Sequence, residues 1–392
     1  MSTTPGRLRV AIVGAGMIGR AHAHALRAMR EFFQPVPADV RLTVIADAAA
    51  ALTSDAQARF EFERVASDWR EVVDARDVDV AIVALPNHQH LEPVAALLAA
   101  GKHVLCEKPL APNPTDARVL AEAARRSGLV HGTAFNLRRV PAIAAIQRSV
   151  ARGDLGELRH FSSTYLADYA LSPQTPFTWR YQRALAGGGA LVDLGAHSID
   201  LARFLVGDIA WIRGAQLQTF ITRRPIPAGH VIGHAKAAST GEFGTVDNDD
   251  IASFTVRFAN GVIGDFTISR IAAGFPNAPG FRIIGSRGSA SFDFSQGPGF
   301  QYYDDSVPSE INGSRGVIAG PNHPYLADVA VLPVAGAGYG YTETYVAQAH
   351  EFIRAVAQNT PYTPSFEDGL ATTLICDAVA RSAEEGRAVP VT

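Results

Sequence analysis

Two ionisable side chains, Asp193 and His197, stand four residues apart just after the glycine run 187–189. The apolar residues around them recur at helical intervals: Leu191, Leu194, Ile199, Leu201, Phe204 and Leu205. On a helix, residues four apart lie on the same face. A carboxylate that orients and charges a neighbouring imidazole is the usual arrangement of a general base. The alternative is structural, with His197 a satisfied core histidine and Asp193 a helix cap.

A third candidate, Lys108, stands in the triplet Glu-Lys-Pro at positions 107–109. The stretch 101–110 predicts a strand that ends in this triplet, so the lysine lies at the carboxyl end of that strand. Ligands of parallel sheets bind at such ends. The alternative is that Lys108 only forms a surface ion pair with Glu107.

A glycine pattern near the start of the chain predicts a dinucleotide-binding turn. Residues 8–13 form a short apolar run, G-x-G-x-x-G occupies positions 14–19, and a helical pattern extends to position 30. The first glycine permits a tight turn, the second lets the backbone approach a pyrophosphate at the helix start, and the third allows close helix–strand packing. The residues expected to contact the cofactor here are Gly14, Gly16, Met17, Ile18 and Gly19.

An acidic residue, Asp47, ends the second apolar run, 42–46. A carboxylate at this position would bond the ribose hydroxyls of the adenosine. The gap after Gly19 is longer than usual, and the segment 32–37 explains it as an insertion. Residues 48–50 are alanines and offer no arginine for a 2′-phosphate. The sequence therefore predicts NAD rather than NADP.

The next buried strand is predicted over 78–84, and the residues after it should also lie at the cofactor. We expect contacts there from Leu85, Pro86, Asn87 and His90. The pairs His88/His90 and His22/His24 suggest metal ligands, but no third ligand has a sensible spacing. We therefore predict no metal site.

The fold class that follows is an α/β Rossmann domain with a parallel sheet, then an α+β domain with a large, mainly antiparallel open sheet. The first domain spans 1–135, and the second, for substrate binding and oligomerisation, spans 136–392. In the second, strands are expected over 158–166, 209–220, 251–258, 262–269, 281–284 and 290–294, and helices over 342–358 and 366–385. Two long stretches, 223–250 and 296–340, are rich in Gly and Pro and are expected to be irregular.

The amino-acid composition limits the kinds of partner that the protein can have. The chain has 392 residues, 47% hydrophobic and 19% charged, with a net charge of −3 and no basic block. These values are typical of an ordinary globular protein and argue against nucleic acid as a partner. Two distant cysteines make no disulfide framework, and no signal peptide or membrane-spanning run is found. We expect a cytoplasmic protein without a membrane partner.

The order of these motifs resembles the Gfo/Idh/MocA oxidoreductase family over nearly the whole chain. The segments 164–168, 177–180 and 323–325 are similar to the branch that includes levoglucosan dehydrogenase and inositol dehydrogenase. The resemblance implies an NAD-dependent enzyme that oxidises a secondary hydroxyl of a sugar, anhydrosugar, glycoside or cyclitol by hydride transfer. It also implies a homo-oligomer, a dimer or tetramer, that uses one face of the antiparallel sheet.

The family pattern also implies roles for particular residues. His197 would be the base for the hydroxyl proton and Asp193 would orient it, although the family divides this role between Asp and His differently in different members. Lys108 would stabilise developing alkoxide charge. Further cofactor contacts would come from Glu107, Lys108, Asn136, Trp179 and Arg180. The substrate would contact Lys108, Arg138, Tyr165, Arg180, Asp193, His197, His323 and Tyr325.

An alternative function uses the same residues. Some members of the superfamily are NAD-dependent glycoside hydrolases, which oxidise the sugar transiently, eliminate the aglycone, add water and reduce the product, so that NAD is recycled. This route needs an additional base near C2, and the candidates are Tyr165, Tyr169, Tyr325 and Tyr339. Net NADH release distinguishes the two functions. A regulator without catalysis is disfavoured, because the full catalytic set is present.

Overall fold

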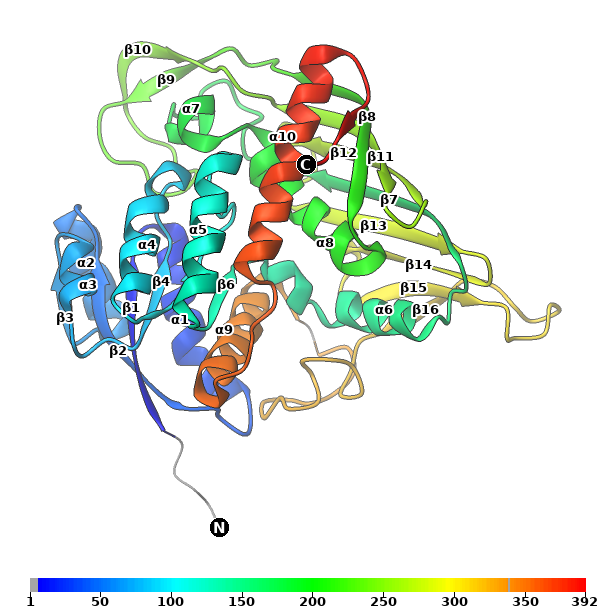
Figure 1. The fold of residues 1–392 in the computed structure, drawn as a ribbon, viewed down its shortest axis with the longest axis horizontal. Helices are drawn as coiled ribbons and strands as arrows, with labels where there is room; N and C mark the ends of the chain where they lie inside the picture. Colours follow the sequence, from blue (N-terminus) through cyan, green and yellow to red (C-terminus); the bar gives the residue numbers. More distant parts are fainter. Residues whose placement is uncertain (1–5, 338) are drawn as a thin grey trace. The chain divides into compact units, whose positions relative to one another are not determined.

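The computed structural model describes residues 6–337 and 339–392, which divide into two compact units. Unit 1 runs to Asn136 and also contains 328–332 and 340–371, whereas unit 2 contains 137–327, 333–339 and 372–392 (Figure 1). The predicted second domain, 136–392, therefore differs from unit 2, because part of it folds with the nucleotide-binding segment. Helix α9 (Tyr341–Gln358) packs along α1 (Met17–Phe32), where the Tyr345 ring meets His22 edge-on at 5.2 Å between centroids.

The segment after α9 also completes unit 1. The backbone N–H of Thr133, in β6 (His131–Thr133), donates to the carbonyl of Pro364 at 3.0 Å. A side chain on Gly132 would overlap the ring of Tyr362. The edge of the parallel sheet at β6 is thus closed by residues that lie more than two hundred positions further along the chain.

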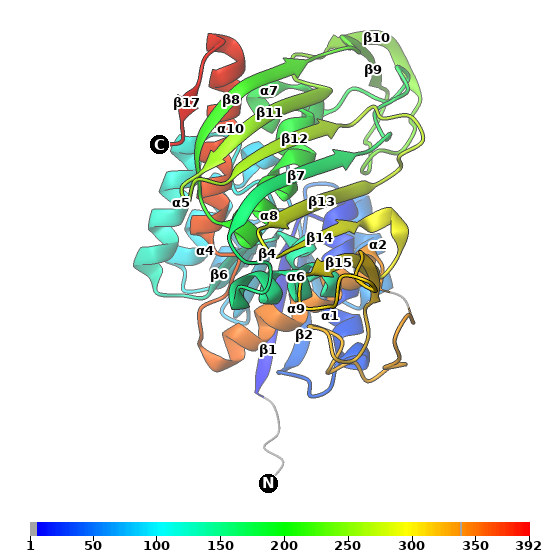
Figure 2. The same ribbon diagram turned by 90° about the vertical axis from the view of Figure 1, so that its right-hand side faces the viewer.

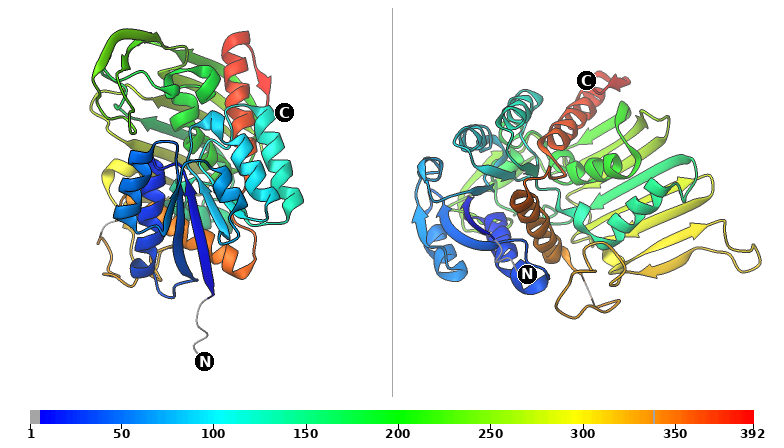
Figure 3. Two further views of the ribbon diagram at one scale, coloured as in Figure 1. Left: turned by 90° about the vertical axis from the view of Figure 1, so that its left-hand side faces the viewer. Right: turned by 60° about the horizontal axis from the view of Figure 1, so that its bottom comes forward.

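Unit 1 is built on a parallel sheet, as predicted, and this sheet has six strands in the order β3-β2-β1-β4-β5-β6. Its other strands are β1 (Arg7–Val13), β2 (Asp39–Ala46), β3 (Arg64–Ala66), β4 (Val80–Val83) and β5 (His103–Cys106). The fully buried parts of the central strands, 10–13 in β1 and 80–83 in β4, are apolar because helices cover both faces. Helices α1 and α2 (Ala50–Phe60) lie on one side, and α4 (Leu91–Ala99) and α5 (Pro114–Ser127) on the other (Figure 3). A short helix, α3 (Arg70–Asp74), follows β3.

Unit 2 is built on a nine-stranded sheet with the order β16-β15-β14-β13-β7-β12-β11-β8-β17. Its strands are β7 (Leu158–Leu166), β8 (Ile209–Gln218), β11 (Ile251–Phe258), β12 (Ile263–Ser269), β13 (Ala278–Gly285), β14 (Gly288–Asp293), β15 (Gly299–Asp304), β16 (Arg315–Ile318) and β17 (Val389–Pro390). All pairs are antiparallel except β7 with β12, which is parallel. The predicted fold class is confirmed.

One face of this sheet packs on α6 (Pro141–Arg152) and α8 (Ala196–Val206), and Figure 2 shows the opposite face. Burial alternates along β11: Phe254 and Val256 are buried, whereas Thr255 and Arg257 are exposed. The buried face carries stacked aromatic rings, with Phe254 against Phe266 at 4.7 Å between centroids. Burying such a ring contributes about 1.5–3 kcal/mol.

The stretches predicted to be irregular contain strands. β9 (Arg223–Pro227) and β10 (Ser239–Thr245) form a hairpin outside the main sheet, and β15 and β16 extend its edge. Their Pro and Gly content hides them in the sequence, although such residues are tolerated at edges. Helix α10 (Phe366–Glu385) has its predicted bounds. Within the described residues, no helix has the length and apolar character needed to cross a membrane.

Candidate active site

The glycine turn of unit 1 has the geometry that a dinucleotide requires. Gly14 has φ +106°, and a side chain there would overlap the carbonyl of Ala84. A side chain on Gly19 would overlap the carbonyl of Gly14, so α1 starts close against β1. A Cβ on Gly16 would meet nothing within 4 Å outside the local turn, which leaves open space at the helix start. Because Gly16 cannot cap α1 with a side chain, the first N–H groups, including those of Met17 and Ile18, remain for an anion such as a pyrophosphate.

Asp47 follows β2 and is fixed by two backbone hydrogen bonds. Its Oδ2 accepts from the N–H of Ala15 at 2.8 Å, and its Oδ1 accepts from the N–H of Ala49 at 2.9 Å. A carboxylate has about four acceptor positions, so it can also accept from ribose hydroxyls. The carboxylate thus lies at the glycine turn, where we expect the adenosine ribose.

Lys108 follows β5 and is flanked by a buried carboxylate. Glu107 Oε1 lies 2.8 Å from His22 Nε2 of α1, and Glu107 Oε2 accepts from the backbone N–H of Lys108 at 3.0 Å. Both His22 and Glu107 are buried, whereas Lys108 is half-buried. Both oxygens of Glu107 therefore bond the protein itself, and Glu107 positions Lys108 rather than offering a free carboxylate to the cofactor.

His90 also has a different place from the one predicted. Its side chain is 0% exposed, and its ring nitrogens face backbone carbonyls, Nε2 at 2.9 Å from Leu85 O and Nδ1 at 3.1 Å from Pro109 O. Burial lowers the pKa of His90, which favours the neutral ring with a single N–H donor. We therefore assign His90 to holding the loops after β4 and β5 together. Leu85 and Pro86 are half-buried in the first of these loops, and Asn87 begins its short 3₁₀ turn.

Asn136, at the end of unit 1, offers a buried acceptor. Its Nδ2 donates to Thr344 Oγ1 of α9 at 2.7 Å, and its Oδ1 has no hydrogen-bond partner among the described residues. An unpaired buried acceptor calls for an explanation. It suits an N–H donor such as the carboxamide of a nicotinamide. The open space at Gly16, the carboxylate of Asp47 and this acceptor all fit NAD.

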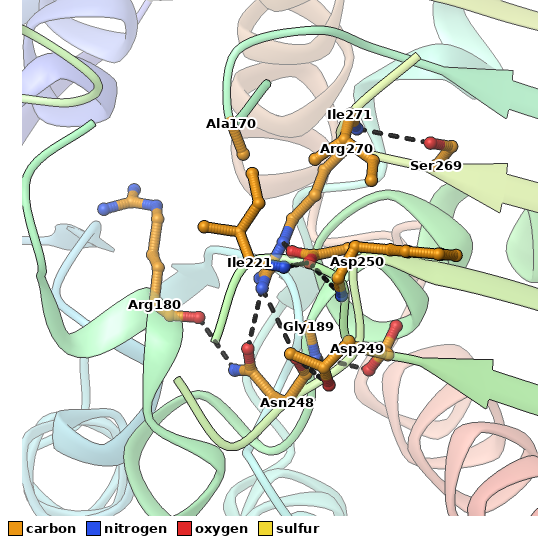
Figure 4. Close-up of polar contacts among 12 residues, drawn as sticks. Ala170, Arg180, Gly189, Ile221, Asn248, Asp249, Asp250, Ser269, Arg270 and Ile271 are labelled. Atoms are coloured by element: carbon orange, nitrogen blue, oxygen red, sulfur yellow. Dashed lines mark hydrogen bonds and ion pairs between the residues drawn. The ribbon is translucent and has the colours of Figure 1, made fainter. Parts of the chain in front are cut away.

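In unit 2, Asp193 lies in a helical turn whose start is tightly fixed. Asp249 is buried, and its two carboxylate oxygens accept from the N–H groups of Gly189 (2.8 Å) and Leu191 (2.7 Å) (Figure 4). The Asp249 backbone carbonyl accepts from Ala190 at 2.8 Å. A side chain on Gly189 would overlap this carbonyl, which explains the glycine at position 189. Burial, partly opposed by these hydrogen bonds, raises the pKa of Asp249.

The turn Leu191–Gly195 is π-helical and continues directly into α8. Such bulges often occur at functional sites. Asp193 is half-buried and its Oδ2 accepts from the hydroxyl of Tyr169 at 2.7 Å. His197, about one turn later, is buried, and its ring lies 6.1 Å from that of Tyr165, whose hydroxyl donates to Asn277 Oδ1 at 2.9 Å. Unit 2 thus groups Asp193, His197, Tyr165 and Tyr169.

Trp179 and Arg180 stand together in a 3₁₀ turn, Trp179–Tyr181. The Arg180 guanidinium lies over the Trp179 ring at 4.4 Å, and the Arg180 carbonyl accepts from Asn248 at 2.9 Å. Figure 4 shows the Arg180 side chain pointing away from the buried polar cluster around Asn248. Both residues are half-buried.

Three predicted substrate residues are engaged elsewhere in unit 2. Arg138 forms a buried bidentate ion pair with Asp200 of α8, at 2.6 and 2.8 Å. The Tyr325 hydroxyl accepts from Arg139 at 2.8 Å, with Tyr325 itself at φ +62°. His323 contacts the backbone of Gly320 through Nδ1. The buried Arg138 therefore has a supporting role, whereas the substrate contacts of the half-buried Tyr325 and His323 stay predictions.

Some supporting residues carry no sequence signal of their own. The pairing of His22 with Glu107 joins residues 85 positions apart, and Asp249 caps a turn 60 positions earlier. No spacing rule connects such pairs. Across residues 6–337 and 339–392, no group of three or more His, Cys, Asp or Glu side chains is arranged to hold a metal.

These features define a nucleotide-dependent oxidoreductase, and comparisons with known proteins agree. Residues 8–135 match the model of the oxidoreductase family with an NAD-binding Rossmann fold, and residues 143–291 match the GFO/IDH/MocA C-terminal domain. Levoglucosan dehydrogenase of Pseudarthrobacter phenanthrenivorans is 39% identical over 378 residues, 96% of each chain. Inositol 2-dehydrogenase of Rhizobium meliloti is 25% identical over 395 residues, 98% of this chain and 99% of its own.

A solved structure of levoglucosan dehydrogenase in complex with NADH and L-sorbose has a TM-score of 0.92 and 38% identity, covering 99% of both chains. The chain belongs to the GFO/IDH/MocA family of oxidoreductases. The predicted family, enzyme class and cofactor NAD are confirmed.

Proposed function

We propose that this enzyme oxidises a secondary hydroxyl of a cyclic sugar, anhydrosugar, glycoside or cyclitol, with NAD as hydride acceptor. The observation that carries the proposal is the fixed carboxylate of Asp193, held by Tyr169 and followed one turn later by the buried His197. The names of the similar proteins, levoglucosan dehydrogenase and inositol 2-dehydrogenase, support a cyclic polyol as substrate.

Each catalytic residue has a distinct task in this reaction. His197 accepts the proton of the substrate hydroxyl, and the negative charge of Asp193 favours the imidazolium that forms. Lys108 donates a hydrogen bond to the substrate oxygen as alkoxide charge develops. Bound NAD supplies the acceptor for the hydride. Trp179 and Arg180 orient cofactor and substrate.

Formation of NADH tests the proposed function. Levoglucosan, L-sorbose and inositol, together with glycosides, are incubated with the enzyme and NAD, and NADH absorbance is followed with the release of aglycone. The expected result is net NADH with at least one of these compounds. Cleavage of a glycoside without accumulating NADH would instead establish the redox-neutral hydrolase.

Lys108→Ala tests the site within the same assay. Turnover should fall about a hundredfold or more, because a donor to developing charge is lost. Affinity for NAD, measured by protein fluorescence quenching, should stay largely intact and serves as the control for folding. Turnover near that of the parent enzyme would remove Lys108 from the chemistry.

We also propose a homo-oligomer formed through the face of the large sheet that α6 and α8 leave open. That face exposes Trp211 (40%) and Ile263 (58%) among polar residues, as subunit interfaces do. Ile263→Glu should reduce the molar mass of the protein in solution, measured by light scattering. Ile311→Glu, which changes an exposed isoleucine in a loop, is the control and should leave the molar mass unchanged. An unchanged mass in Ile263→Glu would refute this interface.

We also propose that the protein is cytoplasmic. The buried thiols of Cys106 and Cys376 form no disulfide, which suits the reducing environment of the cytoplasm.

A further inference from the structure

A hydroxyl group that the reaction scheme above does not use is bonded directly to the catalytic carboxylate. Tyr169 lies shortly after β7, and its hydroxyl donates to Asp193 Oδ2 at 2.7 Å. Burial, followed by the charge of Asp193, raises the pKa of Tyr169 well above its ordinary value. The phenol therefore keeps its proton throughout the working pH range and acts only as a donor to the carboxylate. Donation to a carboxylate favours its ionised form and fixes its direction.

The backbone beside Tyr169 is held by two buried arginines. The N–H of Ala170 donates to the carbonyl of Arg270 at 3.1 Å, and the Ala170 carbonyl accepts from Arg224 Nη2 at 2.7 Å. Arg270 is itself bonded to the buried Asp250 at 2.8 Å (Figure 4). Both guanidinium groups lie over the ring of Tyr181, at 4.2 Å (Arg224) and 4.8 Å (Arg270) from its centroid. This cluster fixes the point from which the Tyr169 side chain reaches Asp193.

The other side of the Tyr169 ring is covered by the β9–β10 hairpin. His234, in the loop between the two strands, packs on Tyr169 as a tilted ring pair, with 4.1 Å between ring centroids and 31° between planes. The base of the hairpin is anchored, because Phe177 N–H donates to Pro225 O at 2.8 Å and a side chain on Gly244 would overlap the Phe177 ring. The strand β10 is otherwise exposed along its length. The hairpin therefore reaches the catalytic group through His234 and Tyr169.

We propose that Tyr169 is a positioning residue that holds Asp193 in a single orientation toward His197, and that His234 seats the Tyr169 ring. This inference rests on the proposed function, in which Asp193 assists His197 as that residue takes the hydroxyl proton during hydride transfer. Without the hydroxyl, the Asp193 carboxylate loses the bond that fixes Oδ2, while a phenylalanine keeps the ring packing. The hairpin then serves as a structural support for the Asp193 carboxylate, which in turn orients His197.

The test compares Tyr169→Phe, Asp193→Asn and the double variant, using the panel sugar that gives the fastest NADH formation. Tyr169→Phe should lower kcat about tenfold to a hundredfold, the range for losing a hydrogen bond to a charged group, with the KM for NAD unchanged. The double variant should be no slower than Asp193→Asn alone, because both changes act through the same carboxylate. A crystal structure of Tyr169→Phe without ligands should show Asp193 in more than one orientation.

His234→Ala should lower kcat in the same direction but less, and should add nothing to Tyr169→Phe. His230→Ala, an exposed histidine four positions earlier in the same loop, is the matched control and should be unchanged. Suppose that Asp193→Asn loses turnover as expected. A kcat in Tyr169→Phe equal to that of the parent enzyme would then overturn the positioning role, and so would losses in kcat that multiply in the double variant. Full turnover in Asp193→Asn would overturn the proposed function, and the positioning role with it.

Discussion

The turn that carries Asp193 depends on one buried cap, and Asp249→Ala removes that cap. Both carboxylate oxygens of Asp249 are used, on Gly189 N–H at 2.8 Å and Leu191 N–H at 2.7 Å. The alanine variant leaves two buried donors without partners at the start of the π-helical turn. The backbone carbonyl of residue 249 still accepts from Ala190, so the segment that precedes β11 stays anchored.

The cost follows from these two contacts. A buried donor left without a partner costs about 1–3 kcal/mol, and loss of a helix cap about 0.5–2 kcal/mol. Burial raises the pKa of Asp249, which shows that removing the carboxylate from water is costly. Part of the favourable free energy of its hydrogen bonds therefore offsets this desolvation cost. We therefore expect a local loss of about 2–4 kcal/mol, which corresponds to an opening equilibrium about thirtyfold to a thousandfold larger.

Hydrogen exchange followed by mass spectrometry measures this opening directly. Peptides covering 187–206 should exchange faster by about that factor, whereas peptides of the parallel sheet in unit 1 should be unchanged. Asp247→Ala is the matched control: its carboxylate is exposed and accepts a single backbone N–H, from Arg183 at 2.6 Å. Unchanged exchange over 187–206 in Asp249→Ala, or equal acceleration across both units, would refute the capping argument.

Three further predictions address the cofactor, the catalytic pair and the pH dependence. Asp47→Ala should weaken the binding of NAD and reduce the preference for NAD over NADP, both measured by fluorescence titration. Tighter binding of NADP than of NAD by the parent enzyme would contradict the assignment of Asp47 to the ribose. His197→Ala and Asp193→Asn should each nearly abolish turnover, and the double variant should be little worse, whereas additive losses would separate the two residues. Burial lowers the pKa of His103, whose Nδ1 accepts from the N–H of Val130 at 2.9 Å. The unfolded chain therefore binds the proton at higher pH than the folded one, so stability present above about pH 6.5 is lost as the pH falls. The melting temperature should decrease less between about pH 7 and pH 5 in His103→Asn than in the parent, and equal slopes would refute this source.

The parts of the fold that the sequence predicts best are those with strong periodicity. Strands β7 and β11 and helix α10 have their predicted bounds, because alternation and helical spacing there coincide with one buried face. The hairpin β9–β10 was not predicted, because its pairing is local, exposed and rich in Pro and Gly. The return of α9 to unit 1 is also invisible in the sequence, because its amphipathic pattern does not say which partner its apolar face meets.

The candidate site also has parts that the sequence predicts and parts that it does not. The glycine turn and Asp47 could be predicted because each follows a strand at a position where the parallel sheet binds nucleotides. The support of Lys108 by Glu107 and His22 could not, since it depends on how α1 lies against β5. His90 was misplaced for a related reason: sequence position shows that a residue follows a strand, but not whether its side chain turns inward.

The discontinuity of the nucleotide-binding unit has a consequence for protein engineering. A graft of residues 6–136 alone would leave behind Pro364, the partner of Thr133, and Tyr362, which packs on Gly132. It would also expose the face of α1 that α9 covers. A transplant of the NAD-binding module into another scaffold therefore has to carry the segment 340–371 as a second insert. Exchanges of substrate specificity are better made within the loops of unit 2, which leave this shared construction intact.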